Sequence, residues 1–170
     1  MKKKVFYWSP CLNPVGTIKS TINSAISLKK FDQDYDVSII NACGEWDAYI
    51  ETLDKNSINL IDLNFKYFKI LPKRGFLASR FSYLVIFVLS FFPLFFLLKK
   101  HKPNKIILHL ITSLPLTLLS LFRFKTEFIL RISGYPRLNV IRKFFWKTIS
   151  NKIKIVTFPT LDLKKNIEKL

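Results

Sequence analysis

A glycine, a histidine and an arginine stand where chemistry is possible, each beside a short segment typical of a β-strand. Gly16 follows the strand-like KVFYWS and opens a stretch with helical spacing of apolar residues. Backbone N–H groups at a helix start can receive a phosphate or a developing anion, and a glycine allows close approach. His109 and Arg131 end the strand-like NKIILHL and TEFILRI. Because the carboxyl ends of parallel strands share one edge of a sheet, we expect these three residues to lie together.

The turn after Arg131, with the sequence SGYPRLN, adds further candidates at the same edge. Ser133 and Gly134 come directly after the strand, where Gly134 and Pro136 shape the turn. Arg131 and Arg137 are cations suited to phosphate or hydroxyl groups. The segment therefore extends the predicted binding site.

Structural interpretations of the same residues remain open. Gly16 also fits an ordinary turn, His109 a hydrogen-bonded core histidine, and Arg131 an ion pair with Glu127 or a surface position. The sequence contains no GxGxxG, Walker, HExxH, GxSxG or CxxC motif. His101 and His109 have no neighbouring carboxylate, so we expect no metal site.

The elements that must position these residues alternate along the chain. Strands are predicted at 4–9, 37–42, 58–63, 104–110, 126–132 and 153–158, and helices at 15–30, 45–55, 113–122, 140–150 and 161–170, with an irregular basic loop at 64–80. Such alternation is typical of βαβ units. The fold class expected is α/β, a Rossmann-like parallel sheet of about six strands with helices on both faces.

Positive charge is concentrated in the second part of the 170-residue chain, whose formal net charge is +17. Residues 1–62 carry 7 basic and 8 acidic groups, whereas residues 63–170 carry 21 basic and 3 acidic groups. The second part also holds the two longest apolar runs, 81–98 and 106–122. Basic groups flanking apolar surface favour an anionic membrane surface as partner. Nucleic acid is not expected, because the aromatic residues lie within apolar runs and Lys dominates the basic set.

The apolar runs permit two arrangements at a membrane. Residues 81–98 are long enough to span a bilayer and, with 106–122, could form a helical hairpin. Pro93 and Pro115 interrupt the runs, His109 would lie within the bilayer, and the basic flanks give no orientation. We therefore favour a helix at 81–98 that lies in the membrane plane or is half-buried.

Three stretches together resemble a known enzyme family. NPVGTIKSTINSAISLKK, KPNKIILHLITSLPL, and FILRISGYPRLN followed by RKFFWKTISNKIKIVTFPT are similar to the N-terminal half of bacterial family-4-type glycosyltransferases. Those enzymes have two Rossmann-like domains facing across a cleft, the GT-B architecture. The resemblance covers nearly all of the chain. The family often has a second glycine where this chain has Val15, and a histidine where it has Ser133.

The resemblance implies a retaining transfer of a sugar from a nucleotide-sugar co-substrate, without a metal or other cofactor. Residues 1–170 would form the acceptor-side domain, which binds a lipid-linked or glycan acceptor. The nucleotide-sugar domain would be absent and supplied by a separate C-terminal domain or subunit, so this chain alone should be inactive.

Together with the charge and apolar patterns, the resemblance gives the candidate residues roles and the protein a place in the cell. His109 would contact the reacting sugar or acceptor as the catalytic residue, and Gly16, Arg131, Ser133 and Gly134 would bind substrate. The protein would be cytoplasmic and peripheral on the inner face of the plasma membrane. The alternative is a small integral membrane protein with a two-helix hairpin and no catalytic role.

Overall fold

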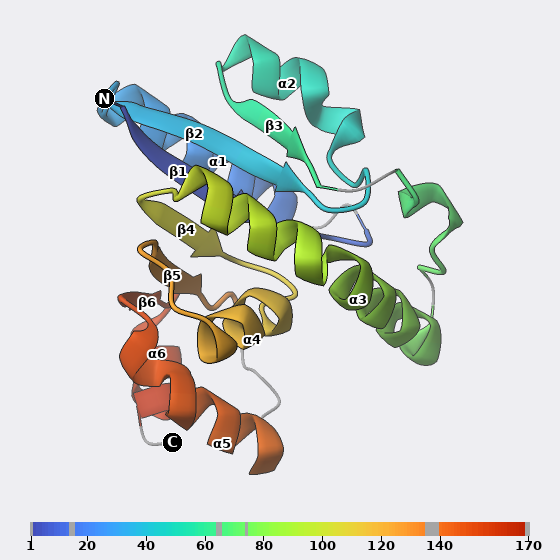
Figure 1. Cartoon of the computed structure of the whole chain (residues 1–170), viewed down its shortest axis with the longest axis vertical. Helices are drawn as coiled ribbons and strands as arrows, with labels where there is room; N and C mark the ends of the chain where they lie inside the picture. The colour runs from blue at the N-terminus through green and yellow to red at the C-terminus, as the bar shows by residue number, and fades with distance from the viewer. Residues whose placement is uncertain (1, 14–15, 64–65, 74, 135–139, 169–170) are drawn as a thin grey trace.

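The computed structural model describes residues 2–13, 16–63, 66–73, 75–134 and 140–168, and Figure 1 shows their arrangement. Within these residues six parallel strands form one sheet in the order β3-β2-β1-β4-β5-β6. The strands are β1 (Lys3–Trp8), β2 (Tyr35–Asn41), β3 (Asn59–Asp62), β4 (Lys105–Leu108), β5 (Glu127–Arg131) and β6 (Ile155–Thr157). The predicted Rossmann-like α/β class is confirmed.

Helices connect the strands on both faces of the sheet. They are α1 (Gly16–Phe31), α2 (Ile50–Lys55), α3 (Phe76–His101), α4 (Ser113–Leu121), α5 (Val140–Ile149) and α6 (Leu161–Glu168), with 3-10 turns at Asp47–Tyr49, Phe68–Ile70 and Ser150–Lys152. The irregular loop predicted at 64–80 is wrong at its end, since α3 already begins at Phe76. Gly75, with a φ of 91°, turns the chain into this helix through a conformation that glycine adopts freely.

The two faces of the sheet have separate apolar cores. Along β1, Val5 and Tyr7 belong to the core under α1, whereas Phe6 and Trp8 belong to the core under α3 and α4. This alternation follows from the period of two in a strand, and the layers are visible in Figure 1 with α1 behind the sheet and α3 in front. Because both faces of the central strands β1 and β2 are covered, these strands read as nearly continuous apolar runs in the sequence.

One side of α3 is fixed to the sheet. Every fourth residue from Ser82 to Leu98 is buried: Ser82, Ile86, Ser90, Leu94 and Leu98. Pro93 lies inside this helix without ending it. The carbonyl group that loses its hydrogen bond belongs to Leu89, on the exposed side, so the helix tolerates the proline.

The two-helix hairpin considered from the sequence is not formed. Residues 105–108 are strand β4, paired with β1 and β5, and only α4, of nine residues, follows in the second apolar run. Among the described residues, α3 alone is long and apolar enough to cross a membrane. Its buried stripe packs against the sheet.

Candidate functional site

The carboxyl ends of β1 and β4 lie side by side, and the chain leaves them toward opposite faces of the sheet. β1 leads to α1 on one face, and β4 leads to α4 on the other. Such a switch point opens a crevice at the sheet edge. A groove of about 740 Å³ lies there, which we call the α1 groove. Its lining residues are Gly16, Thr17, Ser20, Ser24, Ile107, His109, Ile129, Arg131, Ile132, Ser133, Thr157, Phe158 and Pro159.

Most of the residues singled out from the sequence meet in this groove. Gly16, His109, Arg131 and Ser133 line it, although they come from three separate segments of the chain. Gly134 is exposed and is not among the lining residues. Pro136 and Arg137 lie outside the described residues. The convergence expected at one sheet edge is therefore found for four of the five proposed site residues.

The ring of His109 is held between the ends of β1 and β4 and helix α1. Its Nδ1 atom lies 3.0 Å from the Thr21 hydroxyl, which is also 3.2 Å from the Ser9 hydroxyl and 2.9 Å from the Thr17 carbonyl oxygen. The Thr17 carbonyl can only accept a hydrogen bond, so we assign the Thr21 hydroxyl proton to it. Nδ1–H of His109 then donates to Thr21, and Nε2 is the unprotonated nitrogen available to a ligand.

Burial keeps this imidazole neutral. His109 is 6% exposed, and loss of hydration lowers its pKa to about 4, with the nearby charge of Arg131 acting in the same direction. The ring is therefore uncharged at neutral pH. At the groove it can accept a hydrogen bond from a hydroxyl group.

Arg131 provides the positive charge of the groove. It ends β5 on the α1 side of the sheet, where side chains are half-buried while Phe128 and Leu130 are buried on the other side. Its Nη2 atom donates to the Ser20 hydroxyl at 2.6 Å, which fixes the guanidinium against α1. The ion pair with Glu127 that the sequence permitted is not formed, because Glu127 contacts Lys105 instead, at 3.7 Å.

Gly16 is the first residue of α1, a helix that the sequence predicted over 15–30 with Gly16 in its first turn. A Cβ atom placed on it would meet nothing within 4 Å. The fold itself therefore gives no steric reason for a glycine at this position. The open space lies at the end of the helix where backbone N–H groups have no partner within the helix and the helix dipole is positive.

The groove therefore combines a neutral hydrogen-bond acceptor, a fixed cation, small hydroxyl side chains and a helix start. These groups suit a ligand that carries both hydroxyl and phosphate groups. No Asp or Glu is among its lining residues, so general acid–base catalysis by a carboxyl pair is not available from the described part of this groove. Among the described residues, no cluster of His, Cys, Asp or Glu could hold a metal ion.

Hydroxyl side chains of α1 also line the groove, although they are not among the residues that the sequence singled out. Thr17, Ser20, Thr21 and Ser24 recur at intervals of three or four residues, which places them on one face of the helix. Thr17, Ser20 and Ser24 line the groove, and Thr21 forms a hydrogen bond with His109. This stripe of small polar residues beside Gly16 is a signal that could have identified them.

The comparisons with known proteins support the fold. No family model and no curated protein matches the chain. Among solved structures, CalG4, the calicheamicin glycosyltransferase, matches with a TM-score of 0.53 and 8% sequence identity, over 99% of this chain and 41% of CalG4. The chain thus spans about two fifths of the length of that enzyme, and over this length it shares a glycosyltransferase fold.

Proposed function

We propose that this chain is the acceptor-side half of a glycosyltransferase that transfers a sugar from a nucleotide-sugar to a lipid-linked or glycan acceptor at the membrane. The observation that carries the proposal is the meeting of Gly16, His109, Arg131 and Ser133 in the α1 groove. Its groups suit hydroxyls and phosphate, and it lies at the switch point of a sheet with a glycosyltransferase fold. The family-4 resemblance adds a retaining transfer without a metal.

In this proposal each groove residue has a defined task. Nε2 of neutral His109 accepts a hydrogen bond from a hydroxyl of the sugar or the acceptor. Arg131 and the N–H groups at the start of α1 face phosphate oxygens. The bond from Arg131 to Ser20 pre-positions the guanidinium, which lowers the entropy lost when substrate binds. A second Rossmann-like domain, on a separate chain or segment, completes the cleft and holds the nucleotide.

The proposal places the protein on the cytoplasmic face of the plasma membrane. α3 is held along the sheet by its buried stripe and presents an apolar side to the outside. Lys99 and Lys100 lie in its last turn, where cations can meet anionic headgroups. An in-plane helix of this kind gives peripheral attachment.

Sugar transfer in membranes from the native cells tests the proposal, because those membranes contain every other component. The chromosomal gene is left intact, deleted, or replaced by the His109→Ala variant. Isolated membranes then receive a panel of radiolabelled nucleotide-sugars, and label extracted with organic solvent or held in polymer is counted.

One nucleotide-sugar should label a product that disappears on deletion. His109→Ala should lower its rate by about 10²-fold if the ring contacts the transition state. Equal protein levels of the variants, measured by immunoblot, serve as the control. If deletion changes no labelled product with any donor, the chain is not part of a membrane glycosyltransferase.

A further inference from the structure

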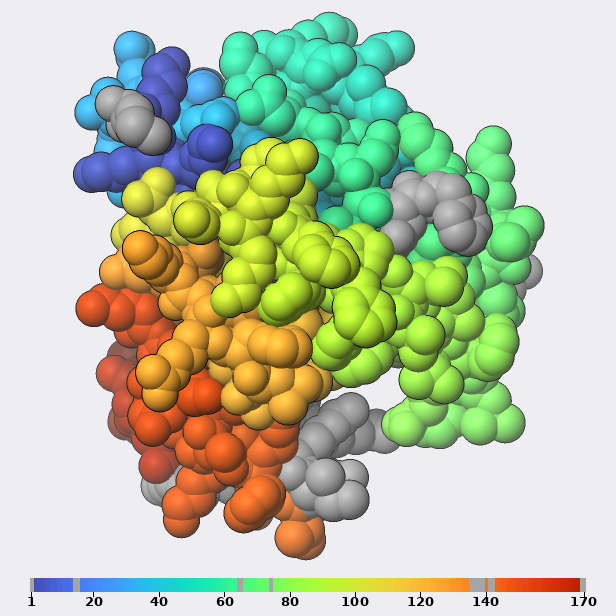
Figure 2. Space-filling model, viewed as in Figure 1, coloured from blue at the N-terminus to red at the C-terminus, as the bar shows by residue number. Residues whose placement is uncertain are grey.

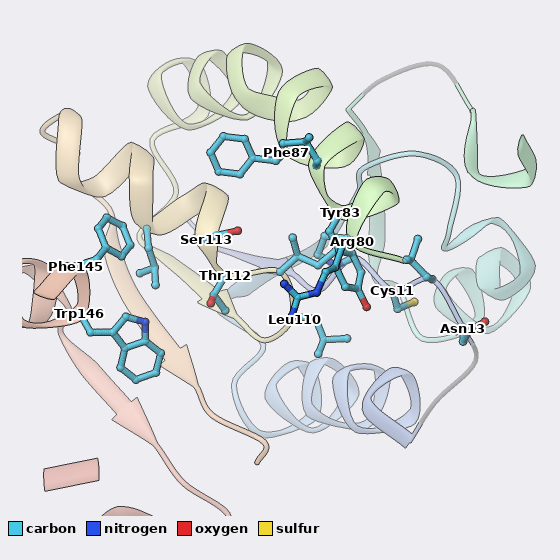
Figure 3. A pocket seen from close by; sticks show the side chains of 15 residues that line it. Cys11, Asn13, Arg80, Tyr83, Phe87, Leu110, Thr112, Ser113, Phe145 and Trp146 are labelled. Atoms are coloured by element: carbon cyan, nitrogen blue, oxygen red, sulfur yellow. The ribbon is translucent and has the colours of Figure 1, made fainter. Parts of the chain in front are cut away.

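A second cavity opens on the opposite side of the loop that carries His109. This cavity, which we call the α3 pocket, has a volume of about 710 Å³ and lies between the N-terminal half of α3, the start of α4, and α5. Figure 3 shows Tyr83 and Phe87 of α3 on one side, Phe145 and Trp146 of α5 on the other, and Leu110 below. The walls are therefore mainly apolar and aromatic, which suits a hydrocarbon chain.

The pocket is continuous with the exposed side of α3. Leu84 lines the pocket and is 59% exposed, and Val88 and Phe92 continue along the same helix with 59% and 65% exposure. Figure 2 shows α3, in green to yellow-green, at the surface of this face of the molecule. A hydrocarbon chain could therefore pass from a membrane that contacts the exposed side of α3 into the pocket without crossing water.

The polar groups of the pocket are positive or neutral. Arg80 lines it together with Asn13, Thr112 and Ser113, and no Asp or Glu is among the described lining residues. The guanidinium carbon of Arg80 lies 4.1 Å from the ring centroid of Phe76, one helical turn earlier. This stacking holds the guanidinium near the start of α3, beside the pocket. There it can bind an anionic headgroup.

A single strained loop separates the α3 pocket from the α1 groove. His109 lines the groove, whereas Leu110 and Ile111 line the pocket. Ile111 has a φ of 46°, which is costly for a β-branched residue. The indole N–H of fully buried Trp8 donates to the Ile111 carbonyl oxygen at 3.1 Å and holds this conformation. The lining of the pocket thus begins at Leu110, the residue next to His109 in the chain.

We propose that the α3 pocket binds the hydrocarbon chain of a long-chain lipid phosphate, with Arg80 at the phosphate. The inference rests on the proposed function and names the acceptor class as a lipid phosphate rather than a soluble glycan. The chain would enter from the membrane-facing side of α3, and the phosphate and its attached group would lie at the loop beside His109. Continuity with exposed apolar surface and the positive charge favour this occupant over a soluble peptide.

Fluorescence of Trp146 provides a direct test. Trp8 and Trp46 are fully buried and Trp146 is half-buried in the pocket wall, so a brominated chain should quench Trp146 selectively. The probe is 11-bromoundecyl phosphate, used with the full chain below the concentration at which it forms micelles. We expect saturable quenching that is lost in the Trp146→Phe variant.

Two pairs of variants locate the probe. Ser113 is exposed and lines the pocket, so Ser113→Phe should fill it without disturbing the core, whereas Leu121→Phe, on the same helix and outside the pocket, is the matched control. Ser113→Phe should weaken binding by at least about tenfold, the loss expected when two methylene groups are no longer buried. Arg80→Ala should weaken binding of the phosphate but not of 11-bromoundecanol, and Lys100→Ala should change neither.

Quenching that does not saturate, or that is equal in Ser113→Phe and Leu121→Phe, would overturn the pocket assignment. Saturable binding of the alcohol with no preference for the phosphate would overturn the role of Arg80. If the probe does not bind but sugar transfer in native membranes depends on the chain, only the proposed lipid site is contradicted. If the probe binds but no transfer product depends on the chain, the proposed function is contradicted and the lipid site is retained.

Discussion

The hydroxyl of Thr21 and the imidazole of His109, 3.0 Å apart, join helix α1 to the end of strand β4. Because the Thr17 carbonyl takes the hydroxyl proton, Thr21 accepts from Nδ1–H and leaves Nε2 for a ligand. The same hydroxyl contacts Ser9 at the end of β1. One small side chain thus connects the two strands that flank the switch point and sets the protonation of the ring between them.

The low pKa of His109 predicts a loss of stability in mild acid. The folded protein has a His109 pKa of about 4, below the ordinary value of 6.5, so the unfolded chain binds the proton more readily. The contribution of His109 to the free energy of unfolding is complete above about pH 6.5 and declines as pH falls toward about 4, by at most about 1.4 kcal/mol per pH unit. Urea unfolding across this range measures it.

Two variants separate His109 from other titrating groups. His109→Gln should flatten this part of the pH profile. Arg131→Gln should raise the His109 pKa observed by NMR, while leaving it below 6.5, because burial is the larger cause. A His109 that titrates near 6.5 in the intact protein contradicts the buried, neutral ring.

Replacing Thr21 tests its role as a positioning residue. Thr21→Val keeps the shape of the buried side chain but removes the acceptor for Nδ1–H, which should destabilise the fold by about 1–3 kcal/mol. The ¹⁵N shifts of the ring should change from a single tautomer to a mixture. Thr21→Ser restores the hydroxyl and should restore both properties. An unchanged tautomer in Thr21→Val would show that the hydroxyl does not set it.

Gly16 offers an unusually clean separation of binding from folding. Since a Cβ there meets nothing within 4 Å, Gly16→Val should change the melting temperature by less than the roughly 2–4 °C typical of a 1 kcal/mol loss in a chain of this size. Sugar transfer in native membranes should nevertheless fall, because the side chain occupies the space kept for phosphate. Lys30→Val, in the last turn of the same helix, is the control. Full activity in Gly16→Val would contradict the binding role and would favour an ordinary turn glycine at this position.

The parallel sheet could be predicted because its signals are local. Each strand is a short apolar run, and all but the strand at 58–63 are followed by a segment with helical spacing. These patterns can be recognised without knowing the partner strand. Parallel topology alone places the carboxyl ends of the strands at one edge of the sheet. The sequence could therefore predict that His109 and Arg131 lie at the same edge.

The remaining features depend on contacts between distant segments. The α3 pocket needs Arg80 of one helix, Trp146 of another and the strained Ile111 between them, and no spacing in the sequence connects these residues. The start of α3 at Phe76 was missed because the polar and basic residues before position 81 hide its helical pattern. Gly134 was predicted in the site because it follows Arg131 and Ser133, yet it does not line the groove.

Attachment of α3 to a membrane should need both its apolar side and anionic lipid. Phe92 and Phe96 are 65% and 61% exposed on this helix, whereas Phe31, at the end of α1, is 90% exposed and lies far from it in the chain. Co-sedimentation with vesicles containing anionic lipid should weaken markedly in Phe92→Asp/Phe96→Asp, and Phe31→Asp should bind like the unaltered protein. Added salt should also weaken binding, because exposed charges are screened within about 8 Å at 0.15 M ionic strength. Binding to neutral vesicles that is insensitive to salt, or equal loss in Phe31→Asp, contradicts peripheral attachment through α3.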